Sequence, residues 1–307
     1  MKEIKTVSVI GLGALGILFG HHLSKKMHWE DLRIVADGSR IAKYQKEGIY
    51  CNGEPCKFRY MTPEEPCEPA DLLLFTVKFN SLEKAIRSVK SHVGEDTIIL
   101  SALNGISSEE MIGEAYGQDK VLYCVAQGMD GIREENRLNY EHMGMLCFGD
   151  REPGIISEKA RRVEHFFKKV DLPHEVETDM KKRLWGKLMM NVGVNQTVAL
   201  YESNYGVIQK EGKARGTLIA AMREVMLLSE KEGILLTEED LNYWLGVLDS
   251  LNPEGKPSMR QDLEAGRFSE VDLFSGTVMK LGEKHGIETP VNRMLYEKIK
   301  EMEEEFF

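Results

Sequence analysis

The sequence predicts an α/β N-terminal domain with a parallel sheet, followed by an all-helical domain. From Ile4 to about Pro173, short apolar runs alternate with helical stretches, and unbroken apolar runs are typical of parallel strands covered on both faces. From Asp179 onward the periodicity is helical and β-branched runs are almost absent. We therefore place the two domains at residues 1–177 and 178–307.

The expected elements follow in order along the chain. The first domain is expected to hold strands at 6–10, 32–36, 71–77, 97–103, 120–128 and 144–154, and helical segments within 11–26, 81–93 and 157–170. In the second domain, breaks bearing Gly and Pro separate helices expected at about 180–200, 213–232, 238–249, 258–265, 270–285 and 290–305.

Composition excludes several classes of protein. The 307 residues are 42% hydrophobic and 29% charged, as in an ordered globular protein long enough for two domains. The net charge of −10 argues against nucleic acid as a partner, and no apolar run reaches the roughly 18 residues of a membrane span. The N-terminus enters a strand pattern at once, so we expect no signal peptide and a cytoplasmic location. The cysteines are irregularly spaced and are expected to be free thiols: Cys51, Cys56, Cys67, Cys124 and Cys147.

A glycine-rich turn follows the first expected strand. Gly11, Gly13 and Gly16 have G-x-G-x-x-G spacing between a strand and a helix. In that context the glycines permit a tight turn, close approach of a pyrophosphate and close helix–strand packing, while the helix N-terminus faces the phosphate charge. This pattern predicts a Rossmann-type dinucleotide-binding domain. The expected cofactor-binding residues in the turn are Gly11, Leu12, Gly13, Ala14, Leu15 and Gly16.

The end of the second strand bears on the choice of dinucleotide. Asp37 follows Gly16 by about 20 residues, where an acidic residue commonly binds the ribose 2′-hydroxyl of NAD. A carboxylate there repels the 2′-phosphate of NADP, whereas the guanidinium of nearby Arg40 suits that phosphate. We expect NADH, and NADPH is the alternative.

Polar residues close two further strands. Lys78 follows the apolar run at 71–77, and Asn104 follows the run at 97–103, directly before Gly105. Ligands of open α/β sheets bind at the carboxyl ends of strands, so both side chains are candidates for the same crevice. A solvated lysine and a turn-forming Asn-Gly pair are the structural alternatives.

The helix expected at 180–200 carries a polar stripe. Lys187, Asn191 and Asn195 recur every four residues, which places them on one side of a helix that is otherwise largely apolar. Trp185 and Leu188 indicate that this helix is at least half buried. Burying an unpartnered lysine is costly, so either the stripe is a solvated face or it has a function.

Further polar residues follow in "KPSMRQDLEAGRFSEVD". Ser258 and Gln261 have the spacing of a capping box, and a helix start also offers backbone N–H groups to a carboxylate. Glu270 is expected to begin the next helix, where the helix dipole favours an acid.

With these residues in view, the chain resembles the ketopantoate reductase family (2-dehydropantoate 2-reductases) over nearly its whole length. The resemblance is carried by "GLGALG", "TVK", the Asn104–Gly105 pair, "LWGKLMMNVGVN", "SMRQD" and "SEVD". It implies NADPH-dependent reduction of 2-dehydropantoate to pantoate, on the route to pantothenate and coenzyme A. It also implies a homodimer through the helical domain and a small-molecule 2-oxo acid substrate. We expect no metal, because the ammonium of Lys187 would supply the electrophile.

The resemblance also implies roles for single residues. Lys187 matches the proton donor of the family, Asn191 and Asn195 match residues that hold substrate, and Ser258 matches a ligand of the substrate carboxylate. Glu270 matches a catalytic residue near the cofactor and the reaction centre. Lys78 and Asn104 match groups that contact cofactor, and Asn104 also reaches substrate.

Two departures from the family pattern qualify these expectations. Asp37, in "ADGSR", stands where members commonly carry an arginine for the 2′-phosphate, and the chain also differs around Tyr205, where some members have a substrate-contacting asparagine. Two alternatives to 2-dehydropantoate reduction therefore stay open. One is reduction of a different branched 2-oxo acid, and the other is a non-catalytic dinucleotide sensor.

Overall fold

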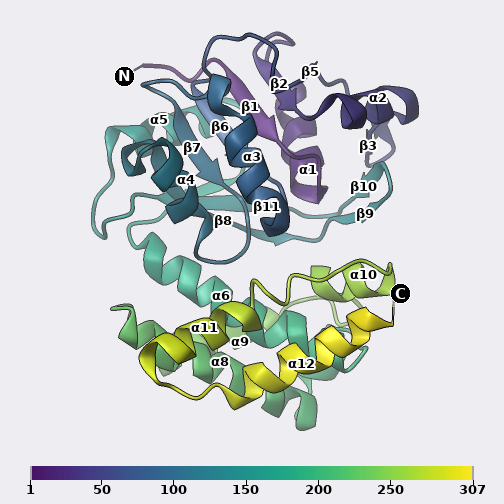
Figure 1. The fold of residues 1–307 in the computed structure, drawn as a ribbon, viewed down its shortest axis with the longest axis vertical. Coiled ribbons are helices and arrows are strands. Elements are labelled where there is room, and N and C mark those ends of the chain that lie inside the picture. Colours follow the sequence, from purple (N-terminus) through teal and green to yellow (C-terminus); the bar gives the residue numbers. More distant parts are fainter. Residues whose placement is uncertain (1, 306–307) are drawn as a thin grey trace. The chain divides into compact units, whose positions relative to one another are not determined.

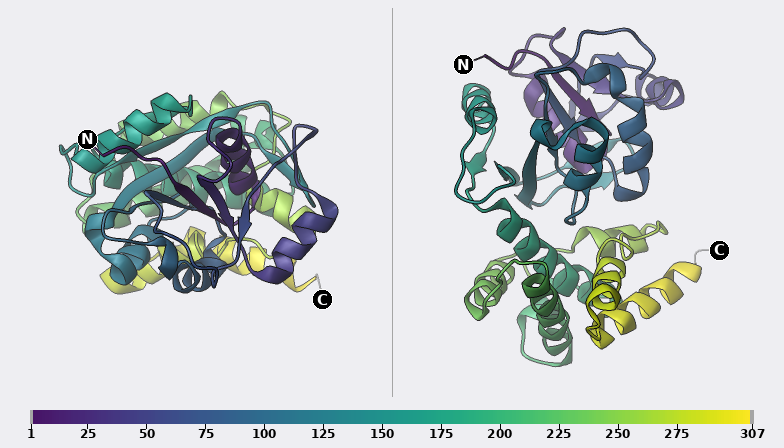
Figure 2. Two further views of the ribbon diagram at one scale, coloured as in Figure 1. Left: turned by 90° about the horizontal axis from the view of Figure 1, so that it is seen from above. Right: turned by 60° about the vertical axis from the view of Figure 1, so that its left-hand side comes forward.

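The structure, a computed structural model, describes residues 2–305. The chain divides into two compact units, Met1–Met180 and Lys181–Phe307. In the part of the chain that is described, the first unit combines strands and helices, whereas the second contains helices only (Figures 1 and 2).

Within residues 2–305, the main sheet of the first unit has eight strands, and β1 lies between β2 and β6. Neighbouring strands pair in parallel, except that β8 and β11 are antiparallel. The predicted α/β class and its parallel sheet are therefore confirmed. In spatial order the strands are β12 (His174–Val176), β11 (Met143–Gly149), β8 (Val121–Met129), β7 (Ile98–Ser101), β6 (Leu72–Phe75), β1 (Val7–Ile10), β2 (Leu32–Val35) and β5 (Tyr60–Met61).

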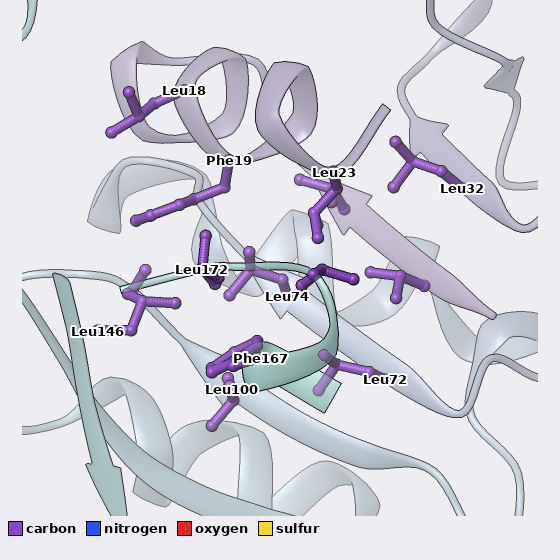
Figure 3. Packing of buried hydrophobic residues seen from close by; sticks show 14 of the residues in the cluster. Leu18, Phe19, Leu23, Leu32, Leu72, Leu74, Leu100, Leu146, Phe167 and Leu172 are labelled. Atoms are coloured by element: carbon purple, nitrogen blue, oxygen red, sulfur yellow. The ribbon is translucent and has the colours of Figure 1, made fainter. Parts of the chain in front are cut away.

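Helices cover both faces of this sheet. Phe19 and Leu23 of α1 gather with Leu74 of β6, Leu100 of β7 and Phe167 of α5 in one apolar cluster (Figure 3). Alternate residues of the same strands, such as Leu73 and Ile99, are also fully buried, because the opposite face is covered too. The helices of the unit are α1 (Ala14–Ser24), α2 (Gly38–Glu47), α3 (Leu82–Ser88), α4 (Ser108–Tyr116) and α5 (Glu158–Lys169), with 3₁₀ turns η1 (Phe79–Ser81), η2 (Lys90–His92) and η3 (Gln118–Lys120).

A smaller sheet lies outside the sequence prediction. Four short strands form it in the described residues, in the order β4 (Glu54–Pro55), β3 (Tyr50–Cys51), β10 (Arg137–Asn139) and β9 (Ile132–Glu134). Strands of two or three residues show no readable periodicity, which also explains why β5 and β12 were not predicted. The helix expected over 81–93 is divided into η1, α3 and η2.

The second unit closely follows its predicted helices. Five of the six expected helices begin and end within two residues of their predicted bounds, and the short α7 was not predicted. The remaining difference is α11, which starts at Ser275 and not at Glu270. The helices are α6 (Met180–Leu200), α7 (Tyr205–Gln209), α8 (Lys213–Lys231), α9 (Glu238–Asp249), α10 (Ser258–Glu264), α11 (Ser275–His285) and α12 (Pro290–Glu304).

Two further observations bear on the expected class of protein. None of the described helices combines the length and the apolarity needed to cross a bilayer. The five cysteines carry free thiols, and they are buried at Cys51, Cys124 and Cys147 and half-buried at Cys56 and Cys67.

Candidate active site

The glycine turn joins β1 to α1, as the sequence predicts. Gly11 has a φ of 99°, which side chains other than glycine rarely adopt. A Cβ atom at Gly16 would lie 2.0 Å from the carbonyl oxygen of Gly11, so this helix residue must be glycine for α1 to pack on the turn. The hydroxyl of Thr76 donates towards the Gly11 carbonyl oxygen, 2.8 Å away, and holds the turn against the end of β6. Thr76 was not among the predicted site residues, although it is a polar residue in an apolar run.

The space around Gly13 indicates whether a dinucleotide fits this turn. A Cβ atom there would approach other atoms no closer than 3.6 Å, and the φ of −73° is ordinary for any residue. Packing within the protein therefore does not require glycine at this position, unlike at Gly16. Gly13 is the N-cap of α1 and makes no side-chain cap, so the helix start presents backbone N–H groups. The turn fits an anionic group that approaches the backbone closely.

Asp37 lies at the carboxyl end of β2 and is the N-cap of α2. Its carboxylate accepts hydrogen bonds from the Ser39 hydroxyl at 2.6 Å and from the Arg40 backbone amide at 2.9 Å. These bonds, with Ser39 contributing most, lower the pKa of Asp37 below its usual value and keep it ionised. Arg40 and Lys84 also lie near the carboxylate, at 3.6 Å and 4.0 Å. The carboxyl end of β2 therefore carries the ionised carboxylate of Asp37, with the exposed cationic side chains of Arg40 and Lys84 beside it.

Lys78 and Asn104 follow neighbouring strands. Phe75 of β6 pairs with Ser101 of β7 in parallel register, so the two following segments leave the same edge of the sheet. Lys78 is exposed and precedes η1, while Asn104 is half-buried between β7 and α4. The Val77 side chain lies beside Gly11, because a Cβ atom there would be 2.8 Å from Val77 Cγ1. The structure therefore brings the glycine turn and the Lys78 segment together.

Buried side-chain hydrogen bonds join the two ends of the loop between β7 and α4, which contains Asn104. The hydroxyls of Ser101 and Ser108 lie 2.8 Å apart, and Ser108 donates to Glu109 at 2.8 Å. Glu109 is fully buried, and this burial raises its pKa to about 7. The loop between these residues is therefore held by side chains at both ends.

The polar stripe lies on a continuous helix, as expected. Helix α6 runs from Met180 to Leu200, so Lys187, Asn191 and Asn195 follow one another along one side. Asn191 and Asn195 are each 7% exposed, and Lys187 is half-buried. Their apolar neighbours Trp185 and Leu188 are buried, so the interpretation as a solvated polar face does not hold for the two asparagines.

Two expectations about local structure are wrong. Ser258 is the first residue of α10 and makes no cap, because Pro257 occupies the N-cap position and Gln261 donates its amide to the Lys256 carbonyl. Ser258 itself is exposed. Glu270 does not begin a helix, since its carbonyl accepts from the Leu273 and Phe274 amides in a turn that precedes α11. Tyr205 begins α7, where its backbone amide donates to the Gly255 carbonyl.

Two family models match this chain. The model described as "Ketopantoate reductase PanE/ApbA" matches residues 7–152, and its C-terminal counterpart, "Ketopantoate reductase PanE/ApbA C terminal", matches residues 179–303. The 2-dehydropantoate 2-reductase of Streptococcus pyogenes serotype M6 is 26% identical over 302 residues, which is 95% of each chain.

Solved structures share the fold. The ternary structure of D-mandelate dehydrogenase with NADH and anilino(oxo)acetate has a TM-score of 0.86 at 20% identity, covering 98% of this chain and 99% of that one. A dimeric ketopantoate reductase from Staphylococcus aureus has a TM-score of 0.79 at 18% identity, covering 98% and 100%. With both family models matched in order along nearly the whole sequence, the chain belongs to the ketopantoate reductase family of oxidoreductases.

Proposed function

We propose that this protein reduces 2-dehydropantoate to (R)-pantoate with a nicotinamide dinucleotide, and that Lys187 is the proton donor. The observation that carries the proposal is the stripe of Lys187, Asn191 and Asn195 on the largely buried helix α6. The same chain has a dinucleotide-type glycine turn. A dinucleotide sensor needs the turn but has no use for an amine and two buried amides in register.

The glycine turn, Asp37, Lys78 and Asn104 are proposed to hold the dinucleotide, with Glu270 near its reacting end. When bound, this cofactor supplies the hydride that reduces the C2 ketone. The Nζ ammonium of Lys187 stabilises the negative charge that develops on the C2 oxygen and donates a proton to that oxygen. The protein thereby provides an electrophile from its own side chain.

The other residues of the second unit are proposed to orient the substrate. Asn191 and Asn195 carry amides that can both donate and accept hydrogen bonds, and their burial fixes them along α6. The exposed hydroxyl of Ser258 is proposed to bind the substrate carboxylate. Glu270 is proposed as a catalytic residue that holds either Lys187 or the substrate hydroxyl. Burial of polar groups in fixed positions favours one substrate orientation.

We expect the protein to prefer NADH over NADPH. The ionised Asp37 accepts from its own helix α2 and repels a 2′-phosphate, although Arg40 and Lys84 partly offset that repulsion. The measurement is kcat/KM for each dinucleotide at a fixed oxo acid concentration. Asp37→Ser removes the charge but keeps an N-cap for α2. The ratio of kcat/KM for NADPH to kcat/KM for NADH should therefore be higher in this variant than in the wild type. A strong preference of the wild type for NADPH would contradict this assignment.

Replacing Ser258 by alanine is expected to raise KM for the oxo acid, with a smaller change in kcat, because a ligand of the substrate carboxylate is lost. Since Ser258 caps no helix, the thermal stability should stay unchanged. Ser250→Ala is the control for KM, as it removes another exposed serine hydroxyl in the same unit, one that donates to the Val247 carbonyl at the end of α9. A fall in kcat at unchanged KM would show that Ser258 does not bind the carboxylate.

The function itself is tested by following dinucleotide oxidation with 2-dehydropantoate, other branched 2-oxo acids and an aryl 2-oxo acid. The highest kcat/KM is expected for 2-dehydropantoate. The aryl 2-oxo acid is included as a substrate because a protein with the same fold is a D-mandelate dehydrogenase. A higher kcat/KM for another oxo acid would assign the protein to that substrate, and no oxo acid-dependent oxidation would favour a sensor.

The homodimer implied by the family also stays a prediction. Leu227, Leu235 and Tyr243 of the second unit are large apolar side chains that are more than half exposed. A subunit contact would remove such side chains from water. The dimeric reductase of S. aureus supports this arrangement at the level of the fold.

A further inference from the structure

Helix α11 does not cap its own N-terminus. Phe274 is the N-cap residue, with φ −95° and ψ −91°, and it has no side chain that can accept a hydrogen bond. The acceptor comes instead from α6, because the backbone amide of Ser275 donates to Oε1 of Gln196 at 3.1 Å. Gln196 is fully buried. One side chain of the helix that carries Lys187 therefore satisfies the first amide of α11.

The carboxamide of Gln196 is fixed in orientation. Its Nε2 atom donates to the Val192 carbonyl, one turn earlier in α6, at 2.8 Å. With the amide nitrogen held in this way, the carbonyl oxygen faces Ser275. Both polar atoms of the side chain thus have partners in a fully buried setting, where leaving either unsatisfied would be costly.

The contact continues into a buried network. The Ser275 hydroxyl donates to Oδ1 of Asn292 in α12 at 2.8 Å, and Nδ2 of Asn292 donates to Glu224 of α8 at 2.7 Å. Ser275 and Asn292 are fully buried, and Glu224 is 7% exposed. Helices α6, α11 and α12 therefore meet at Ser275, and Asn292 links this point to α8. A fully satisfied network of this kind specifies one arrangement of the helices.

Glu270 is linked to this point by a continuous turn. Its carbonyl accepts from the Phe274 amide at 3.2 Å, and the Gly276 amide donates to Val271 at 3.0 Å, so the residues between Glu270 and α11 form one hydrogen-bonded unit. On the other side, the backbone amide and hydroxyl of Ser269 donate to Glu303 of α12 at 2.7 Å and 2.6 Å. The Glu270 segment is thus anchored at both ends.

We propose that Gln196 is a positioning residue, which sets where Glu270 lies relative to Lys187 by tying the start of α11 to α6. This inference rests on the proposed function, in which both residues act on the substrate. Gln196 itself touches neither substrate nor cofactor in this proposal. Its effect is on alignment, and a displacement of about 1 Å in an active site can cost on the order of 10²-fold in rate.

The first test is Gln196→Met, which keeps a long side chain and removes both hydrogen bonds. We expect kcat to fall about tenfold to 10²-fold, while KM for the dinucleotide stays within about twofold because the glycine turn is in the other unit. Thr197→Val is the matched control. The hydroxyl of this fully buried neighbour has no hydrogen-bond partner within the described residues, so its removal should leave kcat nearly unchanged. Equal kcat values for the two variants would overturn the proposal.

A second variant, Gln196→Glu, covers the case in which Gln196→Met does not fold. A protonated glutamic acid can both donate to Val192 and accept from Ser275, whereas the ionised form cannot donate. Burial raises the pKa of such a carboxyl, so kcat relative to wild type at the same pH should be highest at low pH and fall as the pH rises. A ratio that does not change with pH would contradict the proposed role of both bonds.

Amide hydrogen exchange separates this proposal from the proposed function. Peptides covering residues 269–276 should exchange faster in Gln196→Met than in Thr197→Val, without any substrate. If wild-type protein reduces no oxo acid but this difference is seen, the proposed function fails while the anchoring contact holds. If exchange is equal in the two variants, Gln196 does not position the segment, whatever the activity.

Discussion

Replacing Lys187 by alanine is expected to lower kcat by on the order of 10²-fold or more, the usual scale for removing a general acid. The ammonium is proposed both to stabilise charge on the C2 oxygen and to supply its proton, so both contributions are lost together. Steady-state oxidation of the dinucleotide with the preferred oxo acid measures the effect. Dinucleotide affinity, measured by fluorescence titration, should change little.

Two further variants sharpen this experiment. Lys187→Arg keeps a positive charge but cannot release a proton near neutral pH, so it should recover little of the lost kcat. Lys181→Ala removes an ammonium from α6 six residues earlier, off the stripe, and should keep near-normal turnover. If Lys187→Ala retained near-normal turnover on every oxo acid that the wild type reduces, Lys187 would not be the proton donor.

Gly16→Ala is expected to destabilise the fold, whereas Gly13→Ala is expected to weaken dinucleotide binding without destabilising it. A Cβ atom at Gly16 would lie 2.0 Å from the Gly11 oxygen and 2.7 Å from Thr76 Oγ1, and much of this obstruction is backbone that cannot rotate away. Overpacking of this kind typically costs about 1–3 kcal/mol in the free energy of unfolding, and sometimes more. At Gly13, the nearest atom would be 3.6 Å away.

Thermal unfolding and NADH titration of the two variants form a matched pair. The melting temperature should fall clearly for Gly16→Ala and stay near the wild-type value for Gly13→Ala. The dissociation constant should rise for Gly13→Ala, because a methyl group would stand where the pyrophosphate approaches. Wild-type affinity in Gly13→Ala would show that the phosphates do not approach this residue.

The parallel sheet could be predicted because its central strands are buried on both faces, so each reads as a continuous apolar run. The position of Lys78 and Asn104 followed from the same rule, since parallel strands end at one edge. The short strands β3, β4, β9 and β10 could not be found, because each has only two or three residues, too few for a pattern, and the pairing that joins their two hairpins, between β3 and β10, is between distant segments.

The start of α11 shows why local rules failed in the second unit. The helix was predicted to begin at Glu270, because Val271, Leu273 and Phe274 are apolar residues directly before the helical pattern; in the structure all three are buried in the turn before α11. The acceptor for the first amide is Gln196, 79 residues away, and no local signal marks it. At Ser258, the local signal was present but misleading, because Pro257 takes the N-cap position and Gln261 turns to the Lys256 carbonyl.

The N-cap role of Asp37, added to its proposed contact with the ribose, limits how cofactor choice can be redesigned in this protein. Its carboxylate holds the first turn of α2 through the Arg40 amide, as well as standing where the ribose is expected. An aliphatic replacement would remove the N-cap of α2 and fray that helix. A raised KM for the dinucleotide would then reflect both the lost contact with the ribose and the frayed helix. Engineering at this position therefore has to exchange charge while it retains an oxygen acceptor.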